Sequence, residues 1–474
     1  MVKSKKIKNI CCLGAGYVGG PTMAVIADKC EDIHVNVVDI CEKRIESWNN
    51  DNLDKLPVYE PGLREIILKK RNINLFFSTN IKEAISAADI IFVAVNTPTK
   101  LDGFGAGYAS DLKYVESSIR KVAQYSVGHT IVVEKSTVPV KTAKIIKDLL
   151  NAVEVRNDSN LSKTFSVLSS PEFLAEGSAI NDLENPDRIL IGGEDELAIE
   201  SLKNIYSRWI PTEKILVTNL WSSELSKLVS NAFLAQRISS INSISALCEK
   251  TGAKINQVSK SIGLDNRVGS KFLKAGPAFG GSCFQKDILS LVYLCKYYGL
   301  NDVAEYWESV VSINNWQRNR ISNLIVETLF NTVSSKKIAL LGFSYKANTN
   351  DTRESASIFI AKDLLKNGAV LSIHDPQVNP KQIKNELGIE ENENYNENSE
   401  GCWSYFQNLY EAVKNADAII ILTEWEDYEN LDWQLIYSLM RKPAWIFDTR
   451  SIISSKAAIK AGLKLWELGK GYLN

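Results

Sequence analysis

Histidine is scarce in this chain, with only three among its 474 residues. His34, His129 and His374 each stand in or beside a run of strand type, so we expect all three to be structural. A histidine-based catalytic triad and a zinc site are therefore nearly excluded, and we predict no bound metal. Acid–base chemistry must then come from lysine, aspartate, glutamate or water.

The chain also lacks long apolar runs, an excess of one charge and patterned cysteines. No apolar run reaches membrane-spanning length and the net charge is −1, which argue against a membrane protein and a nucleic-acid binder. Its eight cysteines have neither disulfide-framework nor metal-ligand spacing. Residues 3–13, basic and then briefly apolar, run into a glycine turn and indicate a first strand instead of a signal peptide. We therefore expect a cytoplasmic protein.

The first half of the chain has the pattern of a dinucleotide-binding fold. A strand over 7–13 leads to a turn that opens an apolar helix, and a second strand ends at Asp39. The glycines permit a tight turn and bring the helix N-terminus to a pyrophosphate, while Asp39 would bind the ribose 2′-hydroxyl and favour NAD over NADP. Arg44 could stack on adenine or be solvated. The turn consists of Gly14, Ala15, Gly16, Tyr17, Val18 and Gly19.

Further strands end in polar turns, where ligands of an open parallel sheet bind. The strands over 89–95 and 130–134 are followed by threonine-rich turns, and the strand over 165–168 by Glu172 and Glu176. These two acids could face a ligand or form a solvated turn, and the sequence leaves both open. The first two turns contain Val95, Asn96, Thr97, Pro98 and Thr99, and Ser136 and Thr137.

An apolar periodicity over 221–250 predicts one long helix, because no glycine or proline interrupts it. A helix of this length usually spans two domains or supplies a subunit interface, so we expect a dimer or a larger homo-oligomer. Lys227 and Asn231 lie four residues apart on one face. Lys227 is either a surface lysine or a cation directed into a cleft, and the sequence alone favours the surface.

The last third repeats the plan of the first. A strand over 336–342, a turn with Lys346 and Arg353, and a strand ending at Asp375 indicate a second nucleotide-type fold that holds an anion. We therefore predict an α/β protein with two Rossmann-like, doubly wound domains joined by a long central helix. Residues 389–400 are acidic and rich in asparagine, which predicts a surface insertion.

The segment 280–287, GGSCFQKD, is the strongest candidate for catalysis. Ser282 can cap the apolar helix that follows, which places Cys283 at a helix N-terminus where the dipole favours the thiolate. Asp287 lies four residues later on the same face. The alternative is a buried thiol in a capped helix. We favour the nucleophile, because two glycines, a serine and an acid are poor core neighbours.

A nucleotide domain, a reactive cysteine and no catalytic histidine suggest oxidation through a thiohemiacetal. The thiolate adds to an aldehyde, hydride leaves to NAD, and water hydrolyses the resulting thioester. Lys227 and Asn231 would stabilise the oxyanion. The basic loop over 271–279 could wrap a phosphorylated substrate.

Nine motifs closely resemble the UDP-glucose/GDP-mannose dehydrogenase family, in particular its eukaryotic UDP-glucose 6-dehydrogenases, over nearly the whole chain. The resemblance implies oxidation of UDP-glucose to UDP-glucuronate with two NAD, through the aldehyde and a cysteine thioester. It implies an NAD-binding domain (1–218), a helical dimerisation domain with the cysteine (219–330) and a UDP-binding domain (331–474). The motifs are GAGYVGGP (14–21), VNTPT (95–99), EKSTVPV (134–140), PEFLAEG (171–177), NPDR (185–188), WSSELSKL (221–228), NAFLAQRISSIN (231–242), FGGSCFQKD (279–287) and DTRES (351–355).

The resemblance also implies roles for individual residues. Cys283 is the nucleophile, Lys227 and Asn231 stabilise the oxyanion, Asp287 handles protons with Thr137 and a water, and Glu172 is the base for thioester hydrolysis. The implied NAD contacts are the Gly14–Gly19 turn, Asp39, Arg44, Val95 to Thr99, Ser136, Thr137, Glu176, Cys283, Lys286 and Arg353. The implied substrate contacts are Glu172, Phe173, Leu174, Ala175, Glu176, Lys227, Asn231, Arg267, Lys274, Phe279, Gly280, Phe343, Lys346 and Arg450.

Some properties stay open. Ala347-Asn348 replaces a Lys-Asp pair usual in animal relatives, so we expect the uridine contacts to differ in detail. UDP-xylose inhibits some relatives through the Thr137 loop, which is a hypothesis for this chain, and a hexamer is implied only by the resemblance. GDP-mannose or UDP-N-acetylmannosamine 6-dehydrogenase activity is the nearest alternative, because those enzymes share the Cys-Lys-Asp set. An NAD-sensing scaffold without activity is the alternative from another class.

Overall fold

The structure is a computed structural model that describes residues 6–152, 163–392 and 401–473. Its contacts divide the chain into two compact units. Unit 1 comprises the chain up to Ser230 together with Leu289–Gly299, and unit 2 comprises Asn231–Ile288 and the chain from Leu300 onward. Most of the acidic insertion predicted over 389–400 lies outside the described residues. The predicted division into three domains stays a prediction.

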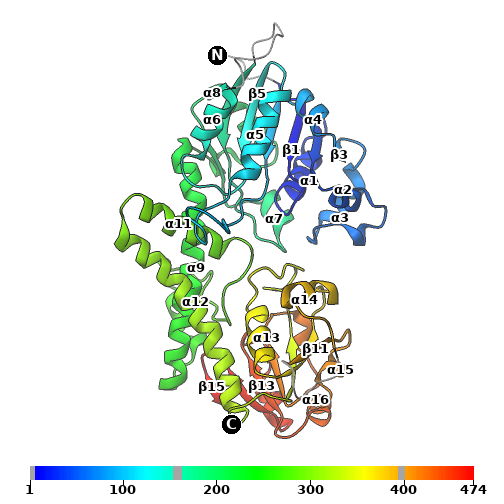
Figure 1. The fold of residues 1–474 in the computed structure, drawn as a ribbon, viewed down its shortest axis with the longest axis vertical. Helices are drawn as coiled ribbons and strands as arrows, with labels where there is room; N and C mark the ends of the chain where they lie inside the picture. Colours follow the sequence, from blue (N-terminus) through cyan, green and yellow to red (C-terminus); the bar gives the residue numbers. More distant parts are fainter. Residues whose placement is uncertain (1–5, 153–162, 393–400, 474) are drawn as a thin grey trace. The chain divides into compact units, whose positions relative to one another are not determined.

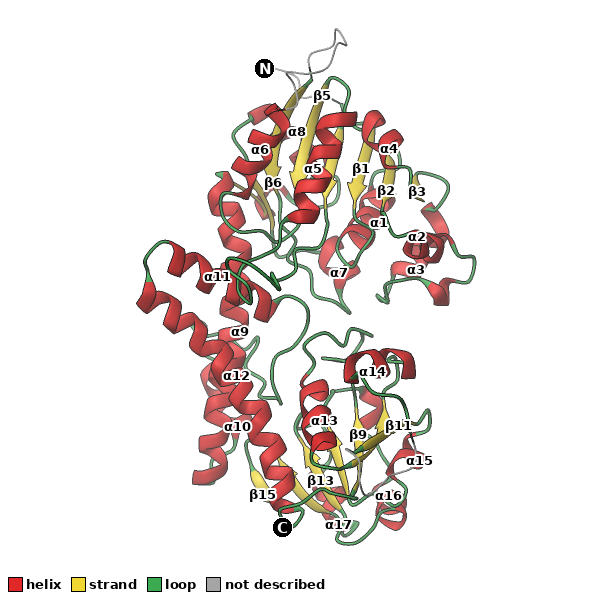
Figure 2. Cartoon of the chain, viewed as in Figure 1, coloured by secondary structure: helices red, strands yellow, loops and turns green. Residues whose placement is uncertain are grey.

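Unit 1 is built on an eight-stranded sheet in the order β3-β2-β1-β4-β5-β6-β7-β8, drawn in yellow in Figure 2. Strands β1 to β6 are parallel, whereas β7 is antiparallel to β6 and β8 is parallel to β7. The strands are β1 (Asn9–Leu13), β2 (His34–Val38), β3 (Leu75–Ser78), β4 (Ile90–Val93), β5 (His129–Glu134), β6 (Thr164–Ser169), β7 (Ile189–Gly192) and β8 (Ile215–Thr218).

Helices cover both faces of this sheet, as a doubly wound fold requires. One hydrophobic cluster packs α1, α2, α3, α7 and α8 on one face, and another packs α4, α5 and α6 on the opposite face. Because both faces are covered, the strands are apolar without alternation, as in β4 with the sequence IIFV. The helices are α1 (Gly19–Lys29), α2 (Glu42–Asn49), α3 (Leu63–Lys70), α4 (Ile81–Ala87), α5 (Lys113–Tyr125), α6 (Thr142–Ala152), α7 (Ala179–Glu184) and α8 (Glu196–Tyr206).

Two helices run from one unit into the other, and the long central helix is one of them. The prediction over 221–250 is confirmed by α9 (Leu220–Thr251), a single helix of 32 residues (Figure 1). The second is α11 (Phe284–Tyr297), which begins just after Cys283. Unit 2 adds α10 (Ile255–Gly263) and α12 (Asn301–Thr328). Among the described residues, no helix is long and apolar enough to cross a membrane.

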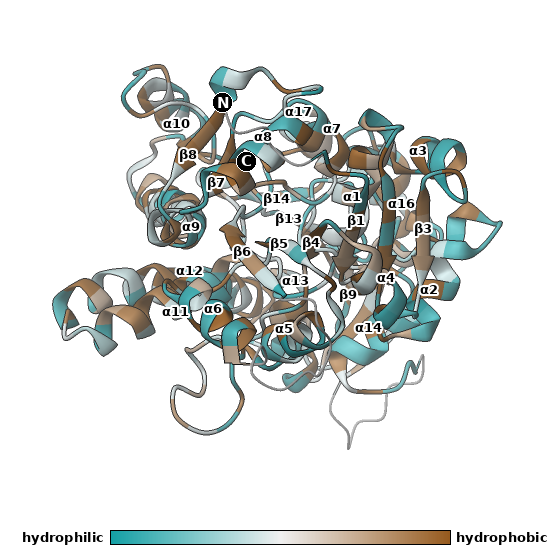
Figure 3. Ribbon diagram, turned by 90° about the horizontal axis from the view of Figure 1, so that it is seen from above, coloured by the Kyte–Doolittle hydropathy of each residue, from teal (hydrophilic) through white to brown (hydrophobic). Residues whose placement is uncertain are grey.

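Unit 2 contains a seven-stranded sheet in the order β11-β10-β9-β12-β13-β14-β15, parallel except for β15. Helices α12, α13 and α14 pack on one face of this sheet and α15, α16 and α17 on the other. Apolar strands such as β4 are drawn in brown in Figure 3. The strands are β9 (Lys337–Leu341), β10 (Val370–His374), β11 (Cys402–Tyr405), β12 (Ala418–Ile421), β13 (Trp445–Asp448), β14 (Lys464–Glu467) and β15 (Gly471–Leu473). The helices are α13 (Ala356–Lys366), α14 (Pro380–Leu387), α15 (Leu409–Val413), α16 (Trp433–Leu439) and α17 (Ser455–Lys460).

The two sheets repeat one plan down to the turn after the first strand. The N–H of Gly14 donates to Val38 O, and the N–H of Gly342 donates to His374 O, each over 2.8 Å. Both glycines have positive φ angles, 108° and 96°, which a residue with a Cβ rarely adopts. The predicted fold class, two Rossmann-like sheets with a long central helix, is confirmed.

The three histidines lie in strands, as expected. His34 and His129 begin β2 and β5, and His374 ends β10. Burial lowers the pKa of His374, whose Nδ1 lies 2.9 Å from the hydroxyl of Tyr428. Among the described residues, no group of His, Cys, Asp and Glu side chains is placed to hold a metal ion.

Candidate functional site

The glycine turn of unit 1 leaves room for a ligand at one position and for none at two others. A Cβ on Gly14 would lie 2.4 Å from Ala94 O, and one on Gly19 would lie 2.0 Å from Gly14 O. A Cβ on Gly16 would meet nothing within 4 Å. Gly14 and Gly19 therefore allow close packing of β1, β4 and α1, while Gly16 leaves the space that a pyrophosphate needs next to the backbone. These residues fit a dinucleotide.

Asp39 follows β2 and is fixed by three donors. Its carboxylate accepts from Ala15 N, Cys41 N and Arg44 Nη1, each over 2.9 Å. Burial alone would raise the pKa of Asp39, but the bonds from Ala15, Cys41 and Arg44 outweigh it, so the pKa is lowered. The acid at the end of the second strand is therefore ionised and held beside the glycine turn. Arg44 pairs with it through Nη1, and its side chain is 39% exposed, so stacking on adenine stays a prediction.

The polar turns after β4 and β5 are hydrogen-bonded to each other. Thr97 Oγ1 donates to Thr137 O over 2.8 Å, and Ser136 Oγ donates to Val95 O over 2.6 Å. These bonds place Val95 to Thr99 directly beside Ser136 and Thr137, at the same edge of the sheet as Gly14. The residues with predicted NAD contacts in these turns are thus brought together.

Glu172, which follows β6, does not form a solvated turn. Its Oε2 lies 2.9 Å from the Nζ of Lys135, a lysine whose side chain is 1% exposed, and its own side chain is 10% exposed. Its Oε1 accepts from Phe173 N over 2.9 Å. The solvated turn, one of the two alternatives that the sequence left open, is therefore wrong for Glu172, while a contact with a ligand stays a prediction. Lys135 was missed in the sequence, although it directly precedes Ser136 and Thr137.

Lys227 is buried, and the expectation of a surface lysine is wrong. It is 8% exposed, and its Nζ lies 5.2 Å from the centre of the Phe173 ring. The guanidinium of Arg188 lies 3.9 Å from the centre of the same ring. A cation close to an aromatic ring is stabilised electrostatically, which helps to keep the buried Lys227 and the half-buried Arg188 beside Phe173. Periodicity alone could not identify this ring, because it lies on another segment.

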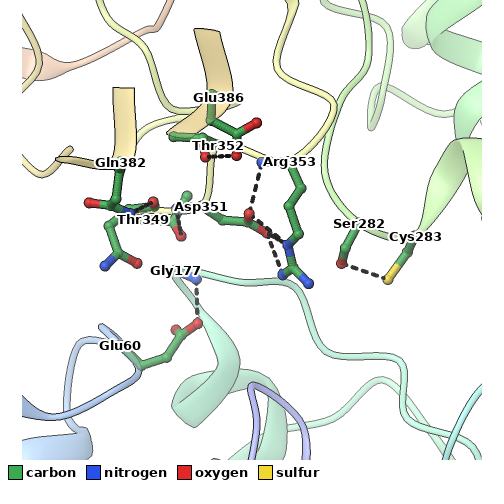
Figure 4. A network of polar contacts seen from close by, with 11 residues as sticks. Glu60, Gly177, Ser282, Cys283, Thr349, Asp351, Thr352, Arg353, Gln382 and Glu386 are labelled. Carbon is green, nitrogen blue, oxygen red and sulfur yellow. Dashed lines mark hydrogen bonds and ion pairs between the residues drawn. The ribbon is translucent and has the colours of Figure 1, made fainter. Parts of the chain in front are cut away.

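A second residue that sequence reasoning missed is Glu60, which holds the loop containing Glu176. Its carboxylate accepts from Gly177 N over 2.7 Å and from Ala179 N over 3.0 Å. The bond to Gly177 is drawn in Figure 4. Because Ala179 begins α7, Glu60 satisfies donors at a helix N-terminus and fixes the segment that contains Glu176. The sequence feature that could have pointed to Glu60 is the Pro61-Gly62 pair that follows it.

In unit 2, Cys283 occupies the predicted position at the start of a helix. Helix α11 begins at Phe284, and Cys283 O accepts the first helical bond, from Asp287 N over 2.9 Å. Cys283 is therefore itself the residue that precedes the helix, and Ser282 lies one residue too early for the cap that we predicted. Ser282 Oγ instead lies 3.4 Å from Cys283 Sγ (Figure 4). The thiol is exposed, so the alternative of a buried thiol is wrong.

Asp287 is fully buried behind this turn and is bound by two side chains. Asn231 Nδ2 donates to it over 2.5 Å, and Lys286 Nζ donates over 2.8 Å. Burial lowers the pKa of Lys286, but the charges of Asp287 and Cys283 outweigh it, so the pKa is raised. Lys286 therefore stays a cation beside Asp287 at the start of α11.

The backbone of the loop that leads to Cys283 is held by three fully buried amides. Asn314 in α12 accepts from Phe279 N over 2.8 Å and donates to Phe279 O over 3.0 Å. Asn242 accepts from Gly276 N over 2.9 Å, and Gln317 donates to Gly276 O over 3.0 Å. The loop that was predicted to wrap the substrate is therefore fixed before any ligand binds. Sequence reasoning missed all three amides.

The turn that contains Arg353 also contacts the loop that leads to Cys283. Gly281 N donates to Arg353 O over 2.9 Å, and a Cβ on Gly280 would lie 2.5 Å from Glu354 O. The guanidinium of Arg353 pairs with Asp351, its Nη2 lying 2.6 Å from Oδ2 (Figure 4). The predicted contacts Gly280, Cys283 and Arg353 thus lie together in unit 2.

Three other residues that were predicted to contact the substrate lie in three different surroundings. Arg450 is bound by Leu422 O, Tyr345 O and Glu424, and its Nη1 lies 3.2 Å from a Cβ built on Gly276, so it borders the substrate loop. The side chain of Phe343 is in the core of unit 2. Arg267 is exposed and pairs with Asp265 over 2.7 Å on the turn after α10.

Three family models match this chain, each over one part of it. They are the NAD binding domain (residues 8–210), the central domain (221–316) and the UDP binding domain (339–455) of the UDP-glucose/GDP-mannose dehydrogenase family. The chain belongs to this family. It is an NAD-dependent dehydrogenase, and NAD is the cofactor that the Gly14 turn and Asp39 fit.

Relatives within the family are similar over their full length. The chain is 52% identical to UDP-glucose 6-dehydrogenase 4 of Arabidopsis thaliana, over 97% of each chain. It is also 52% identical to UDP-glucose 6-dehydrogenase of Drosophila melanogaster, over 98% of this chain and 96% of that one. The solved UDP-glucose dehydrogenase of the archaeon Pyrobaculum islandicum superposes with a TM-score of 0.82 at 29% identity, over 100% of this chain and 99% of that one.

Proposed function

We propose that this dehydrogenase oxidises UDP-glucose to UDP-glucuronate, in two oxidation steps and one hydrolysis. The observation that carries the proposal is the exposed thiol of Cys283 at the start of α11, with the buried Asn231–Asp287 pair and Lys286 behind it. The 52% identity to UDP-glucose 6-dehydrogenases of a plant and an insect supports UDP-glucose as the substrate. A thiol at such a position forms and releases acyl groups readily, which a single alcohol oxidation does not need.

Each step assigns a role to the residues of the chain. Asp287, with Thr137 and a water, takes the proton of the C6 hydroxyl as the aldehyde forms. The Cys283 thiolate then adds to the aldehyde carbon, and Lys227 and Asn231 stabilise the oxyanion by charge and hydrogen bonding. NAD, when bound, accepts one hydride in each of the two oxidations, and the second oxidation leaves a thioester on Cys283.

Hydrolysis of the thioester completes the cycle. Glu172 takes a proton from water, whose oxygen attacks the thioester carbonyl. The carbon–sulfur bond breaks, its electron pair returns to Cys283, and UDP-glucuronate leaves. The buried, fixed geometry of Glu172 supports this role, because a general base must be held within hydrogen-bonding reach of its water.

The remaining contacts follow the sequence predictions. We assign the glycine turn, Asp39, Arg44, the Val95–Thr99 and Ser136–Thr137 turns, Glu176 and Arg353 to NAD. The segment from Glu172 to Glu176, the loop from Lys274 to Gly280, Lys346 and Arg450 are assigned to the nucleotide sugar. The buried side chain of Phe343 leaves only its backbone for such a contact. A cytoplasmic location, an oligomer and inhibition by UDP-xylose are further parts of the proposal.

The test is the amount of NADH formed per UDP-glucose consumed. We expect two NADH per substrate in the wild type and a collapse of turnover in Cys283→Ser, whereas Cys402→Ser, a matched change at a buried cysteine of β11, should retain activity. One NADH per substrate, or activity that does not depend on Cys283, would contradict the thioester route. Comparison of turnover on GDP-mannose and UDP-N-acetylmannosamine tests the alternative substrates.

A further inference from the structure

Lys135 has contacts that suggest a role in the proposed hydrolysis. It follows β5, and its backbone N–H donates to Val93 O over 3.0 Å, which fixes it at the edge of the sheet. Its Nζ lies 2.9 Å from Glu172 Oε2 and 3.3 Å from the hydroxyl of Tyr206 in α8. The buried cation also lies 5.7 Å from the centre of the Tyr206 ring. Lys135 is therefore held from three segments, with its charge directed at Glu172.

The charges around Lys135 support a close pair. Burial lowers the pKa of Lys135, but Glu172 above all outweighs it, and the pKa is raised. Nearby Cys12 is a neutral thiol at physiological pH, because burial raises its pKa to about 12. The buried cation is thus balanced by the carboxylate of Glu172.

We infer that Lys135 is the positioning residue of Glu172, orienting its carboxylate for the water that cleaves the thioester on Cys283. This inference rests on the proposed function. The geometry permits it, because a carboxylate has about four lone-pair sites, while Lys135 forms an ion pair with Oε2 and Phe173 N donates to Oε1. A lone pair of Glu172 thus remains for the water.

The pair also explains how the base is regenerated. When the water gives its proton to Glu172, its oxygen bonds to the carbonyl carbon and the carbon–sulfur bond breaks. Lys135 is then a buried cation beside a neutral acid, which is unfavourable. This favours transfer of the proton from Glu172 to the sulfur or to solvent, and the carboxylate is restored for the next turnover. No electrons are exchanged in this step.

The test measures the two halves of the reaction separately in Lys135→Met. Formation of the thioester is followed by the initial burst of NADH, and its hydrolysis by the mass of the adduct on Cys283 in intact protein. We expect the burst to remain and hydrolysis to slow by about 10²-fold or more, as for loss of a general base. The acyl-enzyme should then accumulate and kcat should fall more than KM rises.

Two further variants distinguish this role from a merely structural one. Tyr206→Phe keeps both charges of the pair and should hydrolyse the thioester at close to the wild-type rate. In the double variant Lys135→Met/Glu172→Gln, both charges are gone, so hydrolysis should be as slow as in Glu172→Gln alone and no slower. If the factors by which the two single substitutions slow hydrolysis multiply in the double variant, the inference is overturned, because Lys135 would then not act through Glu172.

The double variant also decides the case in which Lys135→Met does not fold. It leaves no unpaired buried charge, so it should fold, and its comparison with Glu172→Gln gives the same answer. If Glu172→Gln accumulates the adduct but Lys135→Met hydrolyses it normally, only the inference fails. If wild type forms neither UDP-glucuronate nor an adduct on Cys283, the proposed function itself fails.

Discussion

Glu134 and Glu224 are two interacting buried carboxyl groups whose raised pKa values should make unit 1 less stable as the pH rises. Glu134 ends β5, and Glu224 lies in α9. Burial, reinforced by the charge of Glu224, raises the pKa of Glu134 well above its usual range. Burial also raises the pKa of Glu224, although its carboxylate accepts from Lys141 N over 2.6 Å and from Ala143 N over 2.7 Å. The pair therefore keeps a proton at pH values where the unfolded chain has lost it.

The direction and size of the effect follow from linkage. Because the pKa is raised on folding, the contribution to stability is fully present below the unfolded value of about 4.3 and is lost as the pH rises toward the folded value. One proton corresponds to about 1.4 kcal/mol per pH unit, so between pH 6 and 8 the loss reaches at most ~2.7 kcal/mol. Glu134→Gln has nearly the same shape and a permanent N–H donor toward Glu224, but it cannot ionise. We expect it to remove this loss.

The assay is local, because a chain with two units need not unfold in one step. Amide hydrogen exchange at Lys141 and Ala143, the donors to Glu224, is measured at pH 6, 7 and 8 after correction for intrinsic rates. Thermal unfolding at the same pH values gives the global comparison. Protection should fall with pH in the wild type and stay level in Glu134→Gln. Glu116→Gln, at an exposed position of α5, is the matched control and should follow the wild type.

Parallel pH profiles for wild type and Glu134→Gln would refute the reasoning. They would mean that the pair releases its proton near the unfolded pKa, or that water solvates both carboxylates. A uniform loss of protection in Glu134→Gln at all three pH values would instead show that the amide does not fit the carboxyl site.

Two further predictions concern the turns that hold ligands and the nucleophile. Gly16→Ala should have the melting temperature of the wild type without NAD but bind NAD at least about tenfold more weakly, because its Cβ enters open space that the pyrophosphate needs. Unchanged affinity by calorimetry would place the pyrophosphate elsewhere. Gly14→Ala is the contrasting change and should lower the melting temperature itself, because its Cβ would lie 2.4 Å from Ala94 O. Asn314→Leu leaves the N–H and C=O of Phe279 without partners at about 1–3 kcal/mol each, so alkylation of Cys283 should change and urea unfolding should occur at lower concentration. Unaltered thiol reactivity would show that this amide does not position the nucleophile.

Much of the fold and part of the site could be predicted because they depend on short stretches of sequence. The turn from Gly14 to Gly19, the acid Asp39 after the second strand and the helix start after Cys283 are set by periodicity, by glycine geometry and by residues within one element. The same holds for the uninterrupted helix α9. The residue that precedes α11 was predicted one position too early, because Cys283 and not Ser282 stands directly before this helix.

Contacts between distant segments were decided only by the tertiary structure. Lys227 has the sequence context of a surface lysine, but the Phe173 ring, 54 positions earlier in the chain, lies beside it. Lys135 and Glu172 are likewise brought together by β5 and β6, and Asn314 meets Phe279 only because α12 packs against the loop. Sequence patterns show which residues can be charged or polar. Whether a charge is buried, and beside which partner, depends on the packing of separate segments, because the cost of burial is offset only by groups that the folded chain brings within a few ångströms.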